Sequence, residues 1–180
     1  MKKLILLDRD GVINVNRDDS VKSIHEFHPI SGSLEAISLF KKSNLQVAIV
    51  TNQAIVGRGI ITEDQLDKIH AYMNLLLSPQ DIQINEIFSC TSADDSDPRR
   101  KPNPGLLIEA LSYFNVLPHE AILIGDSLRD IVAASLVGCH RYLVLTGHGQ
   151  KTLNEGIPES LQPLKVAKDL LTAAKNILKI

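Results

Sequence analysis

Residues 4–16 read LILLDRDGVINVN, an apolar run that ends abruptly in the tetrapeptide DRDG at residues 8–11. A short apolar run bounded by a turn signal is typical of a strand that is covered on both faces of a parallel sheet. Asp8 and Asp10 are two residues apart, so their side chains leave an extended chain on the same side. Two adjacent carboxylates repel unless a positive charge lies between them. The stretch therefore fits a divalent-cation site at the end of a central strand, although a solvated Asp-Gly turn would explain the tetrapeptide alone.

The composition is that of a soluble globular protein. With 180 residues, of which 44% are hydrophobic and 22% charged, the chain is long enough to bury a core, and we expect a single domain over residues 1–180. A net charge of −2 offers no basic surface, which argues against nucleic acid as a partner. The longest apolar runs are too short to span a bilayer, so we expect no membrane partner.

The N-terminal MKKLILLDRD begins like a signal peptide, but its apolar run stops after four residues and no small-residue cleavage site follows. It is more typical of a first strand, which predicts a cytoplasmic protein. Two cysteines, Cys90 and Cys139, do not suggest a disulfide framework. The six histidines show no metal-ligand spacing, and we expect them to be structural or exposed.

Short apolar runs alternate with amphipathic segments along the chain, which is typical of an α/β fold with a parallel sheet. The expected strands are residues 4–7, 47–50, 87–89, 121–124 and 142–145. The expected helices follow Ser33, follow the capping-box residue Thr62, run from Pro104 to about Phe114 and from Leu128 to Val137, and occupy residues 169–179. Gly138 lies where the cap of a helix C-terminus is expected.

Reactive side chains gather where these strands end or in the loops that follow. They are Asp8 and Asp10, then Thr51, Asn52 and Gln53, then Arg100 and Lys101, and finally Asp126 and Asp130. Each group alone could be a helix cap, a turn or a solvated loop. Ligands of open α/β sheets bind beyond the carboxyl ends of the strands, so the joint occurrence of these groups favours one site.

The ordered set DRDG at 8–11, Thr51, Lys101 and GDxxxD at 125–130 resembles the haloacid dehalogenase (HAD) superfamily of phosphatases over nearly the whole chain. DRDGVIN, TNQxxxxRG at 51–59 and RKPxPG at 100–105 are similar to its small capless branch, which contains heptose bisphosphate phosphatases and histidinol-phosphate phosphatases. The resemblance implies a Rossmann-like sheet with helices on both faces and no large cap domain.

The resemblance implies a Mg²⁺-dependent phosphomonoester hydrolase with an aspartyl-phosphate intermediate. Asp8 would be the nucleophile, and Asp10 would protonate the leaving alkoxide and later deprotonate water, a role for which we expect a raised pKa. The implied metal ligands are the Asp8 side chain, the Asp10 backbone carbonyl and Asp126. Thr51 and Lys101 would hold the phosphoryl oxygens. Asp130 would lie in the shell behind them and orient either the metal ligands or Lys101.

The resemblance also places five residues near the substrate: Asn14, Asn52, Gln53, Arg58 and Arg100. Arginine is the natural bidentate partner for a second phosphate. The implied substrate is a small phosphorylated sugar. The expected reaction removes the 7-phosphate of D-glycero-D-manno-heptose 1,7-bisphosphate, a step toward nucleotide-activated heptose for lipopolysaccharide or surface glycans, and the protein is expected to act as a monomer.

Some residues depart from the heptose-type pattern. Relatives of that type often bind a structural zinc in the loop before RKP, through Cys-x-His and a later Cys-x-Cys. Here Cys90 remains, but Ser92 stands in place of the histidine and DDSDPR contains no cysteine. One cysteine cannot form a tetrahedral zinc site, so no structural zinc is expected. Ser127 also replaces a lysine that is common in those relatives.

Other interpretations remain open at this point. A histidinol-phosphate phosphatase, or another small sugar-phosphate phosphatase, would have the same site. A non-catalytic phosphate-binding relative usually lacks one of the first two aspartates, whereas Asp8 and Asp10 are both present. A phosphotransfer receiver domain normally carries its phosphorylated aspartate after a middle strand, which is not the arrangement here.

Overall fold

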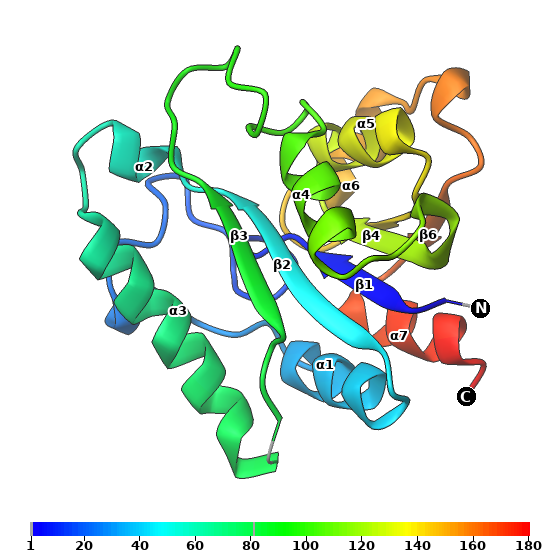
Figure 1. Ribbon diagram of the computed structural model, residues 1–180, viewed down its shortest axis with the longest axis horizontal. Coiled ribbons are helices and arrows are strands. Elements are labelled where there is room, and N and C mark those ends of the chain that lie inside the picture. The colour runs from blue at the N-terminus through cyan, green and yellow to red at the C-terminus, as the bar shows by residue number, and fades with distance from the viewer. Residues whose placement is uncertain (1, 81) are drawn as a thin grey trace.

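A six-stranded parallel sheet organises the computed structural model, which describes residues 2–80 and 82–180 (Figure 1). The strand order across the sheet is β3-β2-β1-β4-β5-β6. The strands are β1 (Leu4–Leu7), β2 (Gln46–Asn52), β3 (Glu86–Cys90), β4 (Ala121–Gly125), β5 (His140–Val144) and β6 (Lys165–Ala167). Because all six run in the same direction, their carboxyl ends share one edge of the sheet, and the first strand lies in its middle.

Strand β1 is fully buried, and its side chains alternate between two apolar clusters. Ile5 and Leu7 pack on one face of the sheet, whereas Leu4 and Leu6 pack on the other. Such a strand needs an uninterrupted apolar run, and the sequence LILL provides one. The hydrogen-bond register pairs Leu7 with Ile49 of β2 and with Ile124 of β4, so the DRDG segment begins at the centre of the sheet edge.

Helices cover both faces of the sheet (Figure 1). Helices α1 (Ser33–Lys42), α3 (Glu63–Leu77) and α7 (Leu170–Leu178) bury their apolar residues with Ile5 and Leu7, while α4 (Gly105–Tyr113) and α5 (Leu128–Val137) pack with Leu4 and Leu6. The shorter helices are α2 (Ala54–Gly57) and α6 (Gly149–Glu155), with 3₁₀ turns η1 (Ile24–Glu26), η2 (Ser78–Gln80), η3 (Pro118–Glu120) and η4 (Glu159–Leu161). No cap domain is inserted in the described residues, which confirms the capless α/β prediction.

The five predicted strands and five predicted helices are all present. Thr62 caps α3 as its capping-box pattern predicts: the Gln65 backbone N–H donates to Thr62 Oγ1 at 3.2 Å, and the Thr62 N–H donates to Gln65 Oε1 at 2.9 Å. Strand β6 and helices α2 and α6 were not predicted, because they are too short to show an apolar period. No helix in residues 2–80 or 82–180 is long and apolar enough to cross a membrane.

Candidate active site

A cavity of about 490 Å³ lies at the carboxyl edge of the sheet. Six of the residues predicted for the site line it: Asp8, Asp10, Asn52, Lys101, Asp126 and Asp130. They come from the ends of β1, β2 and β4 and from the loop between β3 and α4. The structure therefore brings together groups that are more than 100 positions apart in the sequence, such as Asp8 and Asp126.

Asp8 follows the last residue of β1 and lies against a buried lysine. Its Oδ1 is 3.1 Å from Lys101 Nζ and accepts a 2.8 Å hydrogen bond from the Arg9 backbone N–H. Burial raises the pKa of the Asp8 carboxyl to about 6, even though the Lys101 cation opposes the shift. Asp8 is thus a partly desolvated carboxylate that points into the cavity, which suits a nucleophile.

Lys101 is held in place by Asp130 and by the sheet. Its Nζ donates to Asp130 Oδ1 at 2.6 Å and to the Val50 carbonyl at 2.7 Å. Burial disfavours the cation, but Asp130 and Asp8 outweigh burial, and the pKa of Lys101 is raised. Lys101 therefore stays charged at the point where a phosphate would meet Asp8, and Asp130 is the group that orients it.

Asn52 fixes the backbone on which Lys101 is carried. Its Nδ2 donates to the Lys101 carbonyl at 2.8 Å, and its Oδ1 accepts from the Lys101 N–H at 3.0 Å. Gly125 serves the same arrangement from β4, since a Cβ there would lie 2.3–2.5 Å from atoms of the Asp130 side chain. The position of Lys101 beside Asp8 thus depends on the side-chain amide of Asn52 and on the absence of a side chain at Gly125.

Asp10 is held by three side chains that donate to its carboxylate. Arg9 Nη2 donates to both oxygens, at 3.0 and 2.8 Å, while Asn14 Nδ2 donates to Oδ1 at 2.8 Å and Gln53 Nε2 to Oδ2 at 2.9 Å. Burial by itself would raise the pKa of the Asp10 carboxyl, but Arg9 and these hydrogen bonds outweigh burial, and the pKa is lowered. The expectation of a raised Asp10 pKa is therefore wrong for the free protein, because Arg9 turns inward and donates to both carboxylate oxygens.

Asp126 approaches Asp8 closely because two glycines leave room for it. A Cβ on Gly11 or Gly147 would lie 2.0 or 2.1 Å from Asp126 Oδ2, and both glycines have positive φ. The same oxygen accepts a 2.7 Å hydrogen bond from the His148 N–H. Burial, with help from Asp8 and Asp130, raises the pKa of Asp126 to about 8. This Gly147–His148 loop was not predicted from the sequence, although the TGH at residues 146–148, directly after a predicted strand, was a usable signal.

The acidic groups fit a divalent cation. One carboxylate oxygen from each of Asp8, Asp126 and Asp130 lies within 4.8 Å of the other two. Both oxygens of Asp130 are already occupied, because one accepts from Lys101 and the other from Ser127 Oγ at 2.6 Å. Asp8 and Asp126 are therefore the carboxylates that would bind a cation. Both carboxyls have raised pKa values, although Asp8 also lies beside the Lys101 ammonium, and a divalent cation would favour their ionised forms. Hard oxygen ligands of this kind suit Mg²⁺.

The remaining predicted residues do not all reach the cavity. Thr51 is buried at the end of β2, where its Oγ1 accepts from Gln53 Nε2 at 2.9 Å. Arg58 is exposed after α2. Arg100 is 5% exposed and binds Asp95 at 2.8 Å instead of lining the cavity. The lining instead includes two basic side chains that we did not predict, Arg129 and Lys151.

A Rossmann-like sheet that presents an aspartate pair, a buried lysine and a third aspartate at its carboxyl edge defines a phosphatase of the HAD class. Residues 98–173 match the HAD-hydrolase-like family model. The chain is 41% identical over 178 residues to the D-glycero-beta-D-manno-heptose-1,7-bisphosphate 7-phosphatase of Neisseria meningitidis, which covers 98% of this chain and 95% of that protein.

Other relatives agree with this match. The phosphatase of the same name from Pseudomonas putida is 35% identical over 98% of this chain and 99% of its own length. The crystal structure of D,D-heptose 1,7-bisphosphate phosphatase from Bordetella bronchiseptica, complexed with magnesium and phosphate, superposes with a TM-score of 0.93 at 38% identity and covers 98% of each chain. The chain belongs to the heptose-1,7-bisphosphate 7-phosphatase family of HAD hydrolases.

Proposed function

We propose that this phosphatase removes the 7-phosphate of D-glycero-β-D-manno-heptose 1,7-bisphosphate. The relatives, which are D-glycero-beta-D-manno-heptose-1,7-bisphosphate 7-phosphatases, support the substrate and the β anomer. The observation that carries the chemistry is the position of Asp8, 3.1 Å from the Lys101 ammonium and beside Asp10 and Asp126 in one cavity. The product, a heptose 1-phosphate, would then be open to nucleotide activation at C1 for heptose precursor synthesis.

Asp8 is the proposed nucleophile. Its Oδ attacks the 7-phosphorus, a P–O bond forms to Asp8, and the bond from phosphorus to the C7 oxygen breaks, which gives an aspartyl-phosphate and an alkoxide. Lys101 lies where it can bind a phosphoryl oxygen as charge develops in the transition state, and Thr51 is the second proposed contact. Asp130 keeps Lys101 in this place through its 2.6 Å hydrogen bond.

Asp10 is the proposed proton carrier. It protonates the leaving alkoxide, and as a carboxylate it then takes a proton from the water that attacks phosphorus and frees Asp8. In the free protein Arg9 lowers the pKa of Asp10, so Asp10 is ionised before substrate binds. A phosphate dianion placed beside it favours the neutral acid, so we propose that Asp10 takes up its proton together with the substrate.

Mg²⁺ is the proposed cofactor. Asp8 and Asp126 would hold it with their carboxylates and Asp10 with its backbone carbonyl, and the bound cation would neutralise part of the charge that otherwise keeps a phosphate dianion away from an acidic site. The presence of magnesium and phosphate in the Bordetella relative supports this assignment. That the protein works as a cytoplasmic monomer, without nucleic acid or membrane partners, stays a prediction from the sequence.

The test is a comparison of kcat/KM, with Mg²⁺, among the β and α anomers of heptose 1,7-bisphosphate, heptose 7-phosphate and histidinol phosphate. We expect the β-bisphosphate to give the largest value, with the 7-phosphate released. A larger value for histidinol phosphate would replace the proposal with that alternative, and no turnover of any phosphate ester would remove the catalytic assignment of the site.

A further inference from the structure

The DRDG segment contains a buried arginine that the proposed chemistry does not use. Arg9 is 0% exposed and its Nε has no hydrogen-bond partner. A guanidinium that is removed from water with an unsatisfied donor destabilises a fold unless other contacts compensate, and an apolar side chain of similar volume would avoid this cost. The contacts of Arg9 therefore need an explanation beyond packing.

The charged end of Arg9 makes two contacts on opposite sides. Nη2 lies 3.0 and 2.8 Å from the two oxygens of Asp10, so one nitrogen spans the whole carboxylate. Nη1 lies 3.3 Å from Nε2 of His70, which belongs to α3. The guanidinium is planar and rigid, so fixing Nη1 also fixes the direction from which Nη2 meets Asp10.

The chemistry of the two groups determines the state of His70. Arginine has donors and no acceptor, so Nε2 must accept the hydrogen bond, and the imidazole must be neutral with its proton on Nδ1. Burial and the nearby Arg9 cation lower the pKa of His70 to about 3, in agreement with a neutral ring. His70 thus holds Arg9 in place by accepting a hydrogen bond from Nη1 at its unprotonated Nε2.

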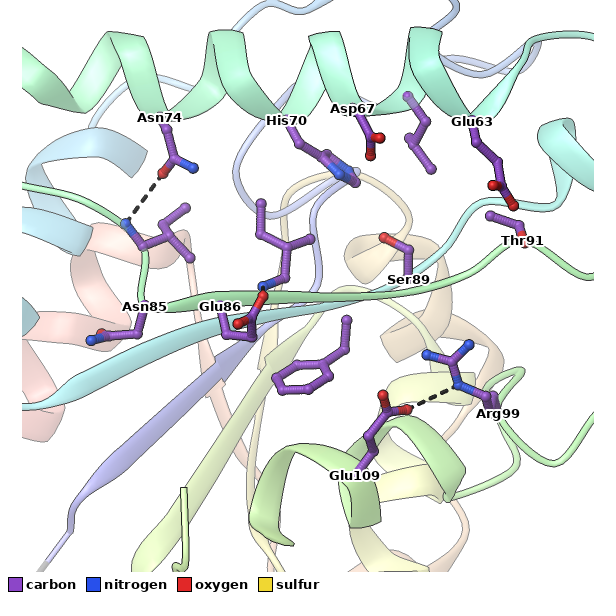
Figure 2. A pocket seen from close by; sticks show the side chains of 14 residues that line it. Glu63, Asp67, His70, Asn74, Asn85, Glu86, Ser89, Thr91, Arg99 and Glu109 are labelled. Carbon is purple, nitrogen blue, oxygen red and sulfur yellow. Dashed lines mark hydrogen bonds and ion pairs between the residues drawn. The ribbon is translucent and has the colours of Figure 1, made fainter. Parts of the chain in front are cut away.

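His70 does not touch the catalytic cavity. Its ring projects from α3 toward the sheet and lines a separate cavity of about 580 Å³, with Glu63, Asp67 and Glu109 among its other walls (Figure 2). A substitution at His70 therefore removes no side chain from the lining of the catalytic cavity. The hydrogen bond of His70 to Arg9 is the contact through which we expect such a substitution to affect catalysis.

We propose that Arg9, anchored by the neutral imidazole of His70, is a positioning residue that fixes the Asp10 carboxyl for proton transfer to the leaving alkoxide. This inference rests on the proposed function, because it assumes that Asp10 is the proton carrier. Asn14 and Gln53 each donate to one oxygen of Asp10 only, whereas Arg9 binds both and so sets the plane of the carboxyl. His70 and Arg9 would then determine how well an alkoxide is protonated without contacting the substrate.

The leaving group separates this role from a purely structural one. A sugar alkoxide needs a proton when it leaves, whereas dinitrophenolate leaves without one. kcat/KM reports the steps up to cleavage of the ester bond, so it reads the acid role of Asp10 and not the later attack of water. We would measure kcat/KM of Arg9→Met, His70→Leu and His70→Gln with heptose 1,7-bisphosphate and with dinitrophenyl phosphate, together with the thermal midpoint of each variant.

We expect Arg9→Met to lower kcat/KM on the sugar ester by about 100-fold, the scale of a lost acid, and on the dinitrophenyl ester by less than about fivefold. His70→Leu should also lower kcat/KM more on the sugar ester than on the dinitrophenyl ester, by a smaller factor than Arg9→Met. His70→Gln, whose amide oxygen can accept a hydrogen bond from Arg9, should restore kcat/KM on the sugar ester. Met73→Ala is the control, since Met73 is a fully buried residue of α3 outside the Arg9 contacts, and its effect should be equal for both esters.

Equal losses on the two esters for Arg9→Met and His70→Leu, or no loss on either, would overturn the proposal. If Arg9→Met does not fold, the two His70 variants decide by the same comparison, because His70 is at the far end of the Arg9 contact. A wild-type enzyme that cleaves another phosphate ester better than the heptose bisphosphate would contradict the proposed substrate and leave this test intact, since any alkyl phosphate that it accepts can be compared with the dinitrophenyl ester.

Discussion

Lys101 Nζ lies 3.1 Å from Asp8 Oδ1, although Asp8 directly follows β1 and Lys101 belongs to the loop between β3 and α4. The lysine is only 2% exposed. A buried cation at this distance favours the ionised form of the carboxyl, and it offers a binding partner to any phosphate that approaches Asp8. The Lys101 ammonium also donates to Asp130 and to the Val50 carbonyl, and these two hydrogen bonds hold it at the cavity wall beside Asp8. The pair links the nucleophile of the proposed mechanism to the group that would stabilise its transition state.

Lys101→Met should lower kcat by at least about 100-fold, because it removes the charge that faces the phosphoryl oxygens and leaves Asp130 buried without its partner. Steady-state phosphate release measures the loss. Lys68→Met is the matched control, since Lys68 forms an exposed ion pair with Asp64 and should leave kcat unchanged. Activity of Lys101→Met within about tenfold of the parent would contradict a catalytic role.

The stability of the metal-free protein should fall as pH rises. Burial raises the pKa of Asp126 from 3.8 to about 8, so the folded protein keeps a proton that the unfolded chain releases near pH 4. Unfolding therefore releases protons across this window, and higher pH favours the unfolded state. Urea denaturation with a chelator should give a lower free energy of unfolding at pH 8 than at pH 5.

Two comparisons isolate the source of that pH effect. Asp126→Asn should flatten the dependence, because the amide does not titrate. Mg²⁺ should stabilise the folded protein most at high pH, where it binds carboxylates that have lost their protons. Stability of the metal-free protein that increases from pH 5 to pH 8, with no difference between the parent and Asp126→Asn, would contradict the assignment.

The main elements of the fold could be predicted from sequence because most of the predicted strands are continuous apolar runs and each predicted helix has a cap or an apolar face. The Gly147–His148 contact with Asp126 could not, since it depends on β5 lying next to β4, which no local pattern specifies. Arg9 was also missed. An arginine between two aspartates is normally solvated. Its hydrogen bond to His70 depends on the position of α3 in the fold, which the local sequence around Arg9 does not specify.

Arg100→Ala tests recognition of the second phosphate. Arg100 binds the exposed Asp95 and lies off the cavity, so it must exchange that partner if it is to meet substrate. We expect kcat/KM to fall about tenfold for the bisphosphate, the scale of one charge-assisted hydrogen bond, and little for a heptose 7-phosphate. Arg99→Ala is the neighbouring control, because Arg99 pairs with Glu109 at the surface. Equal effects of Arg100→Ala on both substrates would remove it from phosphate recognition.

The purified protein should contain no stoichiometric zinc. Cys90 is the one cysteine of the 90–103 loop, and the loop is tied instead by contacts such as Arg100 with Asp95 and Asn103 Nδ2 with the Asp97 carbonyl at 2.8 Å. Elemental analysis after dialysis measures the metal. One zinc per chain that resists dialysis would show that ligands outside this loop complete a site.

The aspartyl-phosphate at Asp8 can be tested directly with heptose 1,7-bisphosphate that carries radioactive phosphorus at either position 7 or position 1. Enzyme is mixed with Mg²⁺ and each substrate, quenched in acid during turnover and cleaved into peptides. We predict that label from position 7 is found on the peptide that contains Asp8, that label from position 1 is not, and that Asp8→Asn carries neither. Turnover without label on that peptide, or label that comes from position 1, would contradict the account.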